Sequence, residues 1–167
     1  MAWNPHLQLT IEKLVYGGDG LARLAADEHG PGKAVFVPFV LDGETVEASL
    51  LEQKRGFARG HLGKILQASP QRVEPPCPYF GRCGGCQYQH IRYEHQLEIK
   101  AAILRETLRR IAKLELKTEI TIHPSRPWNY RNRTRLQVRT APDFALGYYK
   151  FNSHEVLPVE QCPVSSP

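Results

Sequence analysis

The residues with the most distinctive chemistry in this chain are its four cysteines. Three are clustered with the spacing C-x5-C-x2-C and the fourth lies far along the chain: Cys77, Cys83, Cys86 and Cys162. Three neighbouring thiolates and one distant thiolate make a four-sulfur site, which suits either a tetrahedral zinc ion or an iron–sulfur cluster. Gly84 and Gly85 would let the backbone fold tightly around an inorganic core. We therefore expect these four cysteines to be metal ligands.

The spacing leaves three interpretations of this site open. An iron–sulfur cluster is favoured over zinc, because a zinc ribbon more often has two short Cys-x2-4-Cys pairs and this chain has one. A redox dithiol formed by Cys83 and Cys86 is the third interpretation, although the βαβ context of such motifs is absent. Cys162 has an alternative of its own, since a lone cysteine is often a small buried apolar residue.

A second group of residues is suited to binding a polyanion. Five arginines and no acidic residue lie between positions 126 and 139: Arg126, Arg131, Arg133, Arg135 and Arg139. In a strand, most of these arginines would share one face and repel one another unless that face meets phosphates. We expect RNA contacts from this row and from a second basic stretch: Arg131, Arg133, Arg135, Lys54 and Arg55.

Tyr148 and Tyr149 lie near this row in the sequence and could stack on unpaired bases. The alternative is that the arginines form a solvated face, or that they pair with carboxylates of a neighbour.

The composition bounds the class of protein. The chain has 167 residues, of which 41% are hydrophobic, enough for the core of one domain or two small ones. Lys and Arg number 22 against 17 Asp and Glu, which gives a net charge of +5. No apolar run approaches the roughly 18 residues of a transmembrane helix, and residues 1–5 carry no secretory pattern. We expect a soluble, basic, cytoplasmic protein without a membrane partner, whose cysteines are metal ligands or redox groups rather than disulfides.

The first part of the chain has the pattern of short strands separated by glycines. Strands are expected at residues 7–11, 35–37, 45–50 and 57–66, two of them with strict alternation of apolar and polar residues. Residues 17–20, Gly-Gly-Asp-Gly, supply the positive φ angles of a turn. Strands this short and this close favour a small closed or nearly closed barrel. The alternative is a plain antiparallel sheet.

The rest of the chain changes in texture. Residues 69–90 are rich in proline and glycine and should form a loop without regular structure. A helix is expected over 93–113, where apolar residues recur with spacings of three and four: Leu97, Ala101, Leu104, Leu108 and Ile111. Neither the barrel nor the loop offers a matching apolar face, so we expect Leu104 and Leu108 to be partly exposed. Strand-like runs follow at 116–122, 132–140 and 144–151.

Several of these runs resemble the bacterial RNA uracil-C5 methyltransferases, in particular the ribosomal-RNA branch of this 5-methyluridine-forming family. Residues 75–90, which contain Pro-Tyr-Phe-Gly-Arg-Cys-Gly-Gly-Cys-Gln-Tyr-Gln-His, are similar to the family's iron–sulfur segment. Four short runs are similar to the TRAM domain, an OB-like RNA-binding barrel: residues 17–23, 35–38, 43–44 and 69–73. Residues 130–133 and 161–163 are similar to the start of the family's central domain and to its fourth cluster cysteine.

The resemblance implies an α+β chain in four parts. These are a TRAM-like OB barrel that binds RNA (1–70), a cluster loop (71–92), an amphipathic helix (93–115) and the incomplete start of a β-rich central RNA-binding domain (116–167). It further implies a [4Fe-4S] cluster on Cys77, Cys83, Cys86 and Cys162, an RNA substrate, and S-adenosylmethionine as methyl donor. In the family, a cysteine thiolate adds to C6 of uracil, C5 takes the methyl group, and a carboxylate then removes the C5 proton.

The family's nucleophile, base and cosubstrate site lie in a later Rossmann-like domain. These 167 residues contain no Asp-Pro-Pro segment and no glycine-rich strand-to-helix turn. We therefore assign no catalytic and no S-adenosylmethionine-binding residue, and leave open whether the chain alone is an enzyme.

The expected function is the RNA-binding, cluster-carrying N-terminal portion of an RNA uracil-C5 methyltransferase acting on 23S rRNA, with the methyltransferase domain as a further partner. The alternative is a stand-alone TRAM-type RNA-binding module with a structural iron–sulfur or zinc site and no catalysis.

Overall fold

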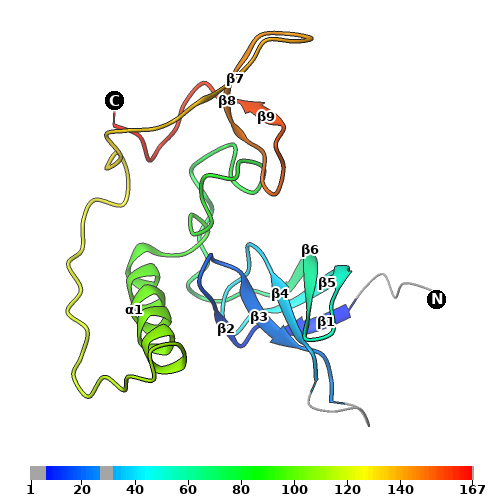
Figure 1. Cartoon of the computed structure of the whole chain (residues 1–167), viewed down its shortest axis with the longest axis vertical. Helices are drawn as coiled ribbons and strands as arrows, with labels where there is room; N and C mark the ends of the chain where they lie inside the picture. Colours follow the sequence, from blue (N-terminus) through cyan, green and yellow to red (C-terminus); the bar gives the residue numbers. More distant parts are fainter. Residues whose placement is uncertain (1–6, 27–31, 167) are drawn as a thin grey trace. The chain divides into compact units, whose positions relative to one another are not determined.

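The computed structural model describes residues 7–26 and 32–166. The chain forms two compact units. The first consists of the residues up to Arg72 together with Ala102–Leu116, and the second of Val73–Ala101 together with the residues from Lys117 onwards. Strands predominate and the described residues contain one α-helix, so the expected mostly-β chain with a single helix is confirmed (Figure 1).

The first unit is built on a curled six-stranded sheet (Figure 1). Its strands are β1 (Leu7–Thr10), β2 (Lys13–Leu14), β3 (Gly20–Arg23), β4 (Ala34–Val37), β5 (Thr45–Gln53) and β6 (Phe57–Gln67). The strand order is β1-β5-β6-β4-β3-β2, and the β4–β6 pair is parallel. Because β1 and β2 lie at opposite edges but are consecutive in the chain, the sheet has to curl until its edges approach. The parallel pair rules out the plain antiparallel sheet.

The two residues between β1 and β2 hydrogen-bond to both sides of the curled sheet. The Ile11 N–H donates to the Glu44 carbonyl over 2.9 Å, and the Gly43 N–H donates to the Ile11 carbonyl over 2.8 Å. The Glu12 N–H donates to the Leu21 carbonyl over 2.8 Å. Backbone hydrogen bonding therefore continues across the point where the two edge strands meet, which stabilises the curl.

The core of the first unit is formed by alternate, inward-pointing residues of these strands together with Ile11 and Val40 from the connections between them. It contains Leu9, Ile11, Ala22, Val35, Val37, Val40, Val46, Ala48, Leu50 and Ala58. The alternation predicted for residues 45–50 is confirmed, because every second residue of this part of β5 is buried. Each of the larger aliphatic side chains contributes about 1.5–3 kcal/mol by leaving water.

The glycine turn expected at residues 17–20 is confirmed. Gly17 and Gly18 have φ angles of 99° and 97°, which side chains with a Cβ rarely adopt. The Val15 N–H donates to the Asp19 carbonyl over 2.9 Å and closes the turn. At Gly20 a Cβ would lie 2.3 Å from Val40 Cγ2, so this position needs glycine because of packing.

The second unit has a small sheet and long irregular segments. Strands β7 (Gln137–Arg139), β8 (Ala145–Tyr149) and β9 (Val156–Pro158) pair antiparallel in this order. Residues 69–90 form no named strand or helix, as the proline and glycine content predicted.

Two of the strand predictions for this part of the chain are wrong: one strand is absent and the other is much shorter than predicted. Residues 116–122 contain no strand, and of residues 132–140 only β7 is one. The arginines at 131, 133 and 135 therefore do not form one face of a strand. An extended segment needs a neighbour for its backbone groups, and β7 pairs with β8 at three positions. Leu136 and Val138 are 38% and 59% exposed, so they do not form the buried face that a strand would have given them.

Helix α1 (Tyr93–Arg110) ends three residues before the predicted end, and a different face is buried. Ile99 is its buried residue, while Ile111 beyond its end is 79% exposed. Ile99, Ile103 and Glu106 share a face by their spacing, and in the first unit the Glu106 Oε1 lies 2.6 Å from Lys13 Nζ. The apolar periodicity of the sequence predicted a different buried face for α1, because periodicity takes no account of this ion pair.

The prediction that Leu104 and Leu108 are partly exposed is confirmed, because Leu104 is 47% exposed and Leu108 is half-buried. Within the described ranges no helix is long and apolar enough to cross a membrane.

A buried ion pair joins Glu44, just before β5, to Arg72, which follows β6, the last strand of the first unit. Glu44 is fully buried and receives two hydrogen bonds from Arg72, Nε to Oε1 over 2.6 Å and Nη2 to Oε2 over 2.8 Å. The N–H groups of Leu41 and Ser69 donate to the same carboxylate over 2.8 and 3.1 Å. Burial alone would raise the pKa of Glu44, but Arg72 and the two N–H groups outweigh it and hold the pKa below its ordinary value.

We expect Glu44→Ala to lower the free energy of unfolding by about 3 kcal/mol, because it leaves the Arg72 charge and two N–H groups without their acceptor. A lowered folded-state pKa stabilises the protein above the ordinary glutamate pKa of about 4.3, and this contribution is lost as the pH falls through the lowered value. Urea unfolding at pH 7 and pH 3 measures both effects, and the variant should lose less stability on acidification than the wild type.

The matched control is Glu12→Ala, which removes an exposed partner of Arg23 at 3.3 Å. Such a surface pair contributes at most about 1 kcal/mol. Equal losses in the two variants would show that the buried pair has no special role.

Candidate metal centre and RNA-binding surface

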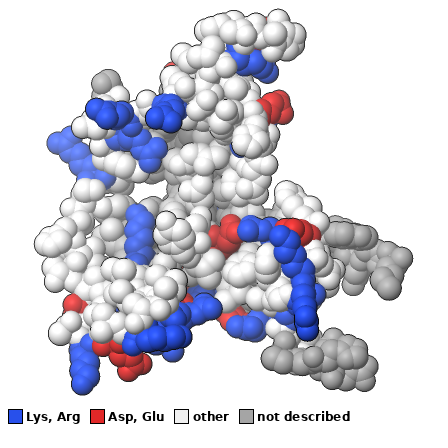
Figure 2. Space-filling model, viewed as in Figure 1, with Lys and Arg blue, Asp and Glu red and all other residues white. Residues whose placement is uncertain are grey.

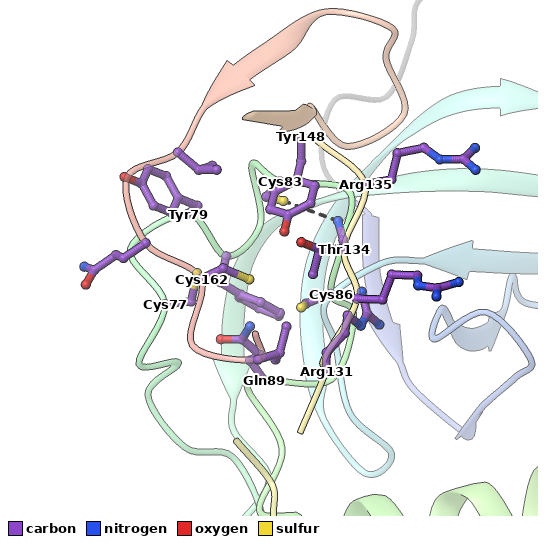
Figure 3. A pocket seen from close by; sticks show the side chains of 16 residues that line it. Cys77, Tyr79, Cys83, Cys86, Gln89, Arg131, Thr134, Arg135, Tyr148 and Cys162 are labelled. Atoms are coloured by element: carbon purple, nitrogen blue, oxygen red, sulfur yellow. Dashed lines mark hydrogen bonds between the residues drawn. The ribbon is translucent and has the colours of Figure 1, made fainter. Parts of the chain in front are cut away.

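The four cysteines line one cavity of about 290 Å³ in the second unit (Figure 3). The structure thus brings together all four residues that the sequence selected as ligands, including the distant Cys162. Three of the selected arginines, Arg131, Arg133 and Arg135, line the same cavity. Their roles as metal ligands and RNA contacts stay predictions.

Tight turns in the loop position the first cysteines. The Phe80 N–H donates to the Cys77 carbonyl over 3.1 Å, and the Cys83 N–H donates to the Tyr79 carbonyl over 2.8 Å. The Tyr79 hydroxyl accepts a hydrogen bond from the Glu160 N–H over 3.2 Å. The loop is therefore joined to the segment that carries the fourth cysteine even before any metal is considered.

The loop also adds to the small sheet through its glycine. The Gly84 N–H donates to the Tyr149 carbonyl over 2.9 Å, and the Phe151 N–H donates to the Arg82 carbonyl over 2.7 Å. A Cβ at Gly84 would lie 3.3 Å from the Tyr149 carbonyl oxygen and 3.4 Å from that of Lys150. This close approach of two backbones gives Gly84 a packing role that is independent of a metal.

The segment that carries Cys162 holds the first arginine by its backbone. The Arg131 N–H donates to the Val164 carbonyl, and the Ser166 N–H donates to the Arg131 carbonyl, both over 2.9 Å. The Asn129 N–H donates to the Pro163 carbonyl over 2.9 Å. Cys162 and the arginine segment therefore share one local scaffold.

The four sulfur atoms are close enough to affect one another's ionisation. Burial raises the pKa of Cys86, and the nearby sulfurs of Cys162, Cys83 and Cys77 raise it further, against a hydrogen bond from Gln89. Burial and the neighbouring sulfurs likewise raise the pKa of Cys83. Four thiolates cannot gather at such a place without a compensating positive charge.

Cys162 differs from these two cysteines. Burial alone would raise the pKa of its thiol, but hydrogen bonds from neighbouring groups, among them the N–H groups of Val164 and Ser165 and the Tyr148 hydroxyl, lower it. Hydrogen bonds that stabilise a thiolate are suited to a metal-ligand sulfur.

The sulfurs surround the cavity rather than meet at one point. In the described part of the chain no three His, Cys, Asp or Glu side chains are placed to hold a single metal ion. A zinc ion at about 2.3 Å from each sulfur would require the sulfurs to lie about 3.8 Å apart. The choice between a cluster and a single ion at these sulfurs stays a prediction.

The arginines of the cavity rim are available for a ligand. Arg131, Arg133 and Arg135 are exposed, and among the described residues none of them has a carboxylate partner. Other arginines are engaged, such as Arg72 with Glu44 and Arg59 with Asp19. On the face shown in Figure 2, Lys and Arg side chains occupy more of the surface than Asp and Glu.

The second predicted basic stretch lies in the first unit, on the turn between β5 and β6. Lys54 Nζ lies 5.5 Å from the centre of the Phe57 ring and 3.0 Å from Glu52 Oε1, while Arg55 is exposed. The Phe57 ring packs edge-on against Phe36, with the ring centres 5.9 Å apart. Cations beside an aromatic pair are suited to single-stranded nucleic acid, although the Lys54 charge is partly engaged.

The sequence did not single out Gln89, which also lines the cysteine cavity (Figure 3). It stands within the run that resembles the family's iron–sulfur segment, and this was the available signal. A glutamine carries no spacing rule of its own, so its position beside a sulfur could not be deduced from the pattern.

Comparison with known proteins first defines the domain. Residues 6–62 match the model of the TRAM domain. This range covers almost the whole curled sheet, and it includes the glycine turn and the β5–β6 turn.

Curated relatives are similar to almost the whole of this chain. A protein named "Uncharacterized RNA methyltransferase" from Aquifex aeolicus is 43% identical over 93% of this chain and 35% of its own length. A "23S rRNA (uracil(1939)-C(5))-methyltransferase RlmD" from Pectobacterium atrosepticum is 40% identical over 97% of this chain and 35% of its own length. This chain thus spans about one third of the curated relatives that it matches.

A solved structure shows the same fold. The tRNA (uracil-54, C5)-methyltransferase of Pyrococcus abyssi, in complex with S-adenosyl-L-homocysteine, superposes with a TM-score of 0.57 over 95% of this chain and 33% of its own, at 24% identity. The resemblance seen in the sequence is therefore confirmed: residues 6–62 match the TRAM domain, and the chain is similar to the corresponding third of RNA methyltransferases, 23S rRNA uracil-C5 methyltransferases among them.

We expect Gly84→Ala to destabilise the second unit by about 1–3 kcal/mol, because the added methyl group meets two backbone carbonyls that cannot easily move. Thermal melting of the metal-free chain measures this effect without any contribution from ligation. The control is Gly56→Ala, where a Cβ would meet nothing within 4 Å. If both variants melt like the wild type, the loop does not pack on β8 as closely as described.

Proposed function

We propose that this chain is the RNA-binding, cluster-carrying portion of an S-adenosylmethionine-dependent RNA uracil-C5 methyltransferase that acts on 23S rRNA. The observation that carries the proposal is that four cysteines line one cavity together with three arginines that have no carboxylate partner among the described residues. The relatives support the substrate class, because one of them is named for methylation of 23S rRNA at uracil C5.

The metal in this proposal is a [4Fe-4S] cluster on Cys77, Cys83, Cys86 and Cys162. The four-sulfur donor set around one cavity and the resemblance of residues 75–90 to the family's iron–sulfur segment support a cluster over zinc. A bound cluster would supply positively charged iron to the thiolates and a covalent cross-link between the loop and the end of the chain. The second unit would depend on this link, because ligation closes a long stretch of chain.

The RNA-binding role rests on both units. In the first, the strand order corresponds to a five-stranded OB-like barrel if β1 and β2 count as one bent strand, and the TRAM match covers it. In the second, Arg131, Arg133 and Arg135 would bind phosphates, while Tyr148 and Tyr149 offer faces for unpaired bases.

The division into residues 1–70, 71–92, 93–115 and 116–167 follows from the same proposal. Methyl transfer, with its nucleophile, base and S-adenosylmethionine site, is assigned to residues beyond those of this chain. An enzyme that modifies ribosomal RNA works in the cytoplasm, so we place the protein there.

We expect Cys83→Ala to give colourless protein, because three remaining thiolates do not complete the cluster. The wild-type chain, assembled with iron and sulfide, should absorb broadly near 400 nm and melt at a higher temperature than the variant. The free energy lost should be about that of closing a long loop, several kcal/mol.

The control is the wild-type chain after removal of iron with a chelator, which should melt like the variant. A variant that keeps the melting curve of the cluster-loaded wild type would disprove a structural cluster. A wild-type chain that binds zinc and no iron would favour the stand-alone zinc module instead.

We expect replacement of Arg131, Arg133 and Arg135 by alanine to weaken binding of single-stranded RNA and to reduce its dependence on salt. The slope of log affinity against log salt should become shallower by up to about 0.7 for each phosphate that the variant no longer binds. Titration of a labelled oligonucleotide at several salt concentrations measures the slope.

A triple variant of Arg92, Arg109 and Lys117 removes the same charge from exposed positions outside the cavity lining, and should change the slope much less. Equal effects in the two triple variants would mean that net charge alone governs RNA binding. A separate Lys54→Ala, Arg55→Ala variant reports the share of the first unit.

A further inference from the structure

A second cavity of the second unit adjoins the cysteine cavity and has a different chemical character. It is an open groove of about 510 Å³, lined by side chains from β7, from β8 and from the turn between β8 and β9; we call it the β8–β9 groove. Arg135 and Tyr148 line both cavities. Among the described residues that line the groove there is no Cys, Asp or Glu. Its size is within the usual range of small-molecule sites.

Two aromatic rings form part of the groove wall. The rings of Tyr149 and His154 pack edge-on, with their centres 5.5 Å apart and their planes at 80°. Consecutive residues of a strand point to opposite faces, and Tyr148 lines the cysteine cavity whereas Tyr149 does not. Tyr149 is 40% exposed. Its ring is therefore held by a second ring while it stays open to solvent.

Hydrogen bonds within the turn between β8 and β9 keep His154 beside this tyrosine. The Lys150 N–H donates to the Glu155 carbonyl over 2.9 Å, and the Ser153 N–H donates to the Lys150 carbonyl over 3.1 Å. The Ser153 hydroxyl accepts a hydrogen bond from the Glu155 N–H over 3.0 Å. Asn152 has a φ of 51°, a conformation that asparagine adopts more readily than most residues. The aromatic wall is thus formed before a ligand binds, which lowers the entropic cost of binding.

The polar side chains of the groove include groups that are available to a ligand. Lys150 is paired with Glu155, whereas Arg135 is exposed and has no carboxylate partner among the described residues. Figure 3 shows the guanidinium of Arg135 directed away from the four cysteines. The side-chain amides of Gln137 and Asn152 also have no partner in the described part of the chain. The groove therefore offers a guanidinium, hydrogen-bonding amides and an aromatic face together.

We propose that the β8–β9 groove binds one unpaired nucleotide of RNA, with the base stacked on Tyr149 and a phosphate bound by Arg135. The amides of Gln137 and Asn152 bind the polar edge of the base, and His154 fixes the tyrosine ring. The inference rests on the proposed RNA-binding function and adds to it a subsite that contains no cysteine.

An unpaired nucleotide is the ligand that uses all of these groups. Its base has a flat face for the ring and a polar edge for the amides, and its phosphate suits a guanidinium. A base within a duplex is already stacked and paired, so it has no free face or edge to offer. A simple anion would not use the rings, and an apolar molecule would leave the amides without hydrogen bonds.

The experiment measures binding of a labelled hexauridylate to the full chain at several salt concentrations. Tyr149→Ala should weaken binding at least about fivefold, because it removes the stacking face. It should leave the slope of log affinity against log salt unchanged, because no charge is lost. Arg135→Ala should make the slope shallower by about 0.7, the value for one phosphate contact. Tyr149→Phe, which keeps a ring, should recover most of the affinity.

The matched control is Phe144→Ala. Phe144 is 74% exposed, immediately precedes β8 and lines neither cavity, so this variant should bind hexauridylate like the wild type. A second probe is a ribose-phosphate oligomer of the same length without bases. It should bind to the wild type and to Tyr149→Ala with equal affinity, because it has nothing to stack.

Each outcome decides one point. Wild-type affinity in Tyr149→Ala, or equal losses in Tyr149→Ala and Phe144→Ala, would overturn the subsite and leave the proposed function standing. A wild-type chain that does not bind hexauridylate would overturn the proposed RNA binding and this inference with it. If Tyr149→Ala melts at a lower temperature than the wild type, His154→Ala replaces it, because His154 lies on an exposed turn. A loss of affinity for hexauridylate but not for the oligomer without bases is expected, and its absence would disprove the subsite.

Discussion

The crowding of four cysteine sulfurs around one cavity is the constraint on which the second unit depends. Among the described residues the buried apolar cluster lies in the first unit, whereas the second buries fewer apolar side chains, such as Ile91, Val156 and Leu157. Backbone hydrogen bonds fix the loop locally, but they do not replace a core. Burial and, after it, the neighbouring sulfurs raise the pKa values of Cys83 and Cys86. The proposed cluster would lower these pKa values, because its cationic iron would stabilise the thiolates, and it would link distant parts of the chain.

The position of Cys162 also determines where the arginine segment begins. Arg131 is held by backbone hydrogen bonds to residues just beyond Cys162, so whatever fixes that cysteine also fixes the beginning of the basic segment. A row of arginines without carboxylate partners repels itself, and the thiolate ligands of the proposed cluster would reduce that repulsion. The cluster and the RNA-binding segment would in this way support one another, although neither needs to take part in the transfer of a methyl group.

The sequence correctly predicted those features that depend on residues close together along the chain. Alternation along β5, the glycine turn before β3 and the irregular cysteine loop each follow from residues close in sequence, and each is present. The wrong predictions concern segments whose structure depends on residues far away in the sequence. Residues 132–136 have strand-like composition but no strand beside them, and the buried side of α1 is influenced by the contact between Glu106 and Lys13, far apart in sequence. The convergence of Cys162 on the loop was expected through chemistry and family resemblance rather than through any pattern near it.

The arginines of this chain are of two kinds, and they differ in the burial of the groups around them. The Arg72 guanidinium is paired with a fully buried carboxylate that also accepts two backbone N–H groups, so it is fixed and stabilises the end of the first unit. Arg133 and Arg135 are exposed and have no such partner among the described residues. An arginine already satisfied by a buried carboxylate would lose that partner on meeting a phosphate, whereas a solvated one only exchanges water. Exposed arginines such as Arg133 and Arg135 can therefore bind a polyanion at a lower cost than Arg72.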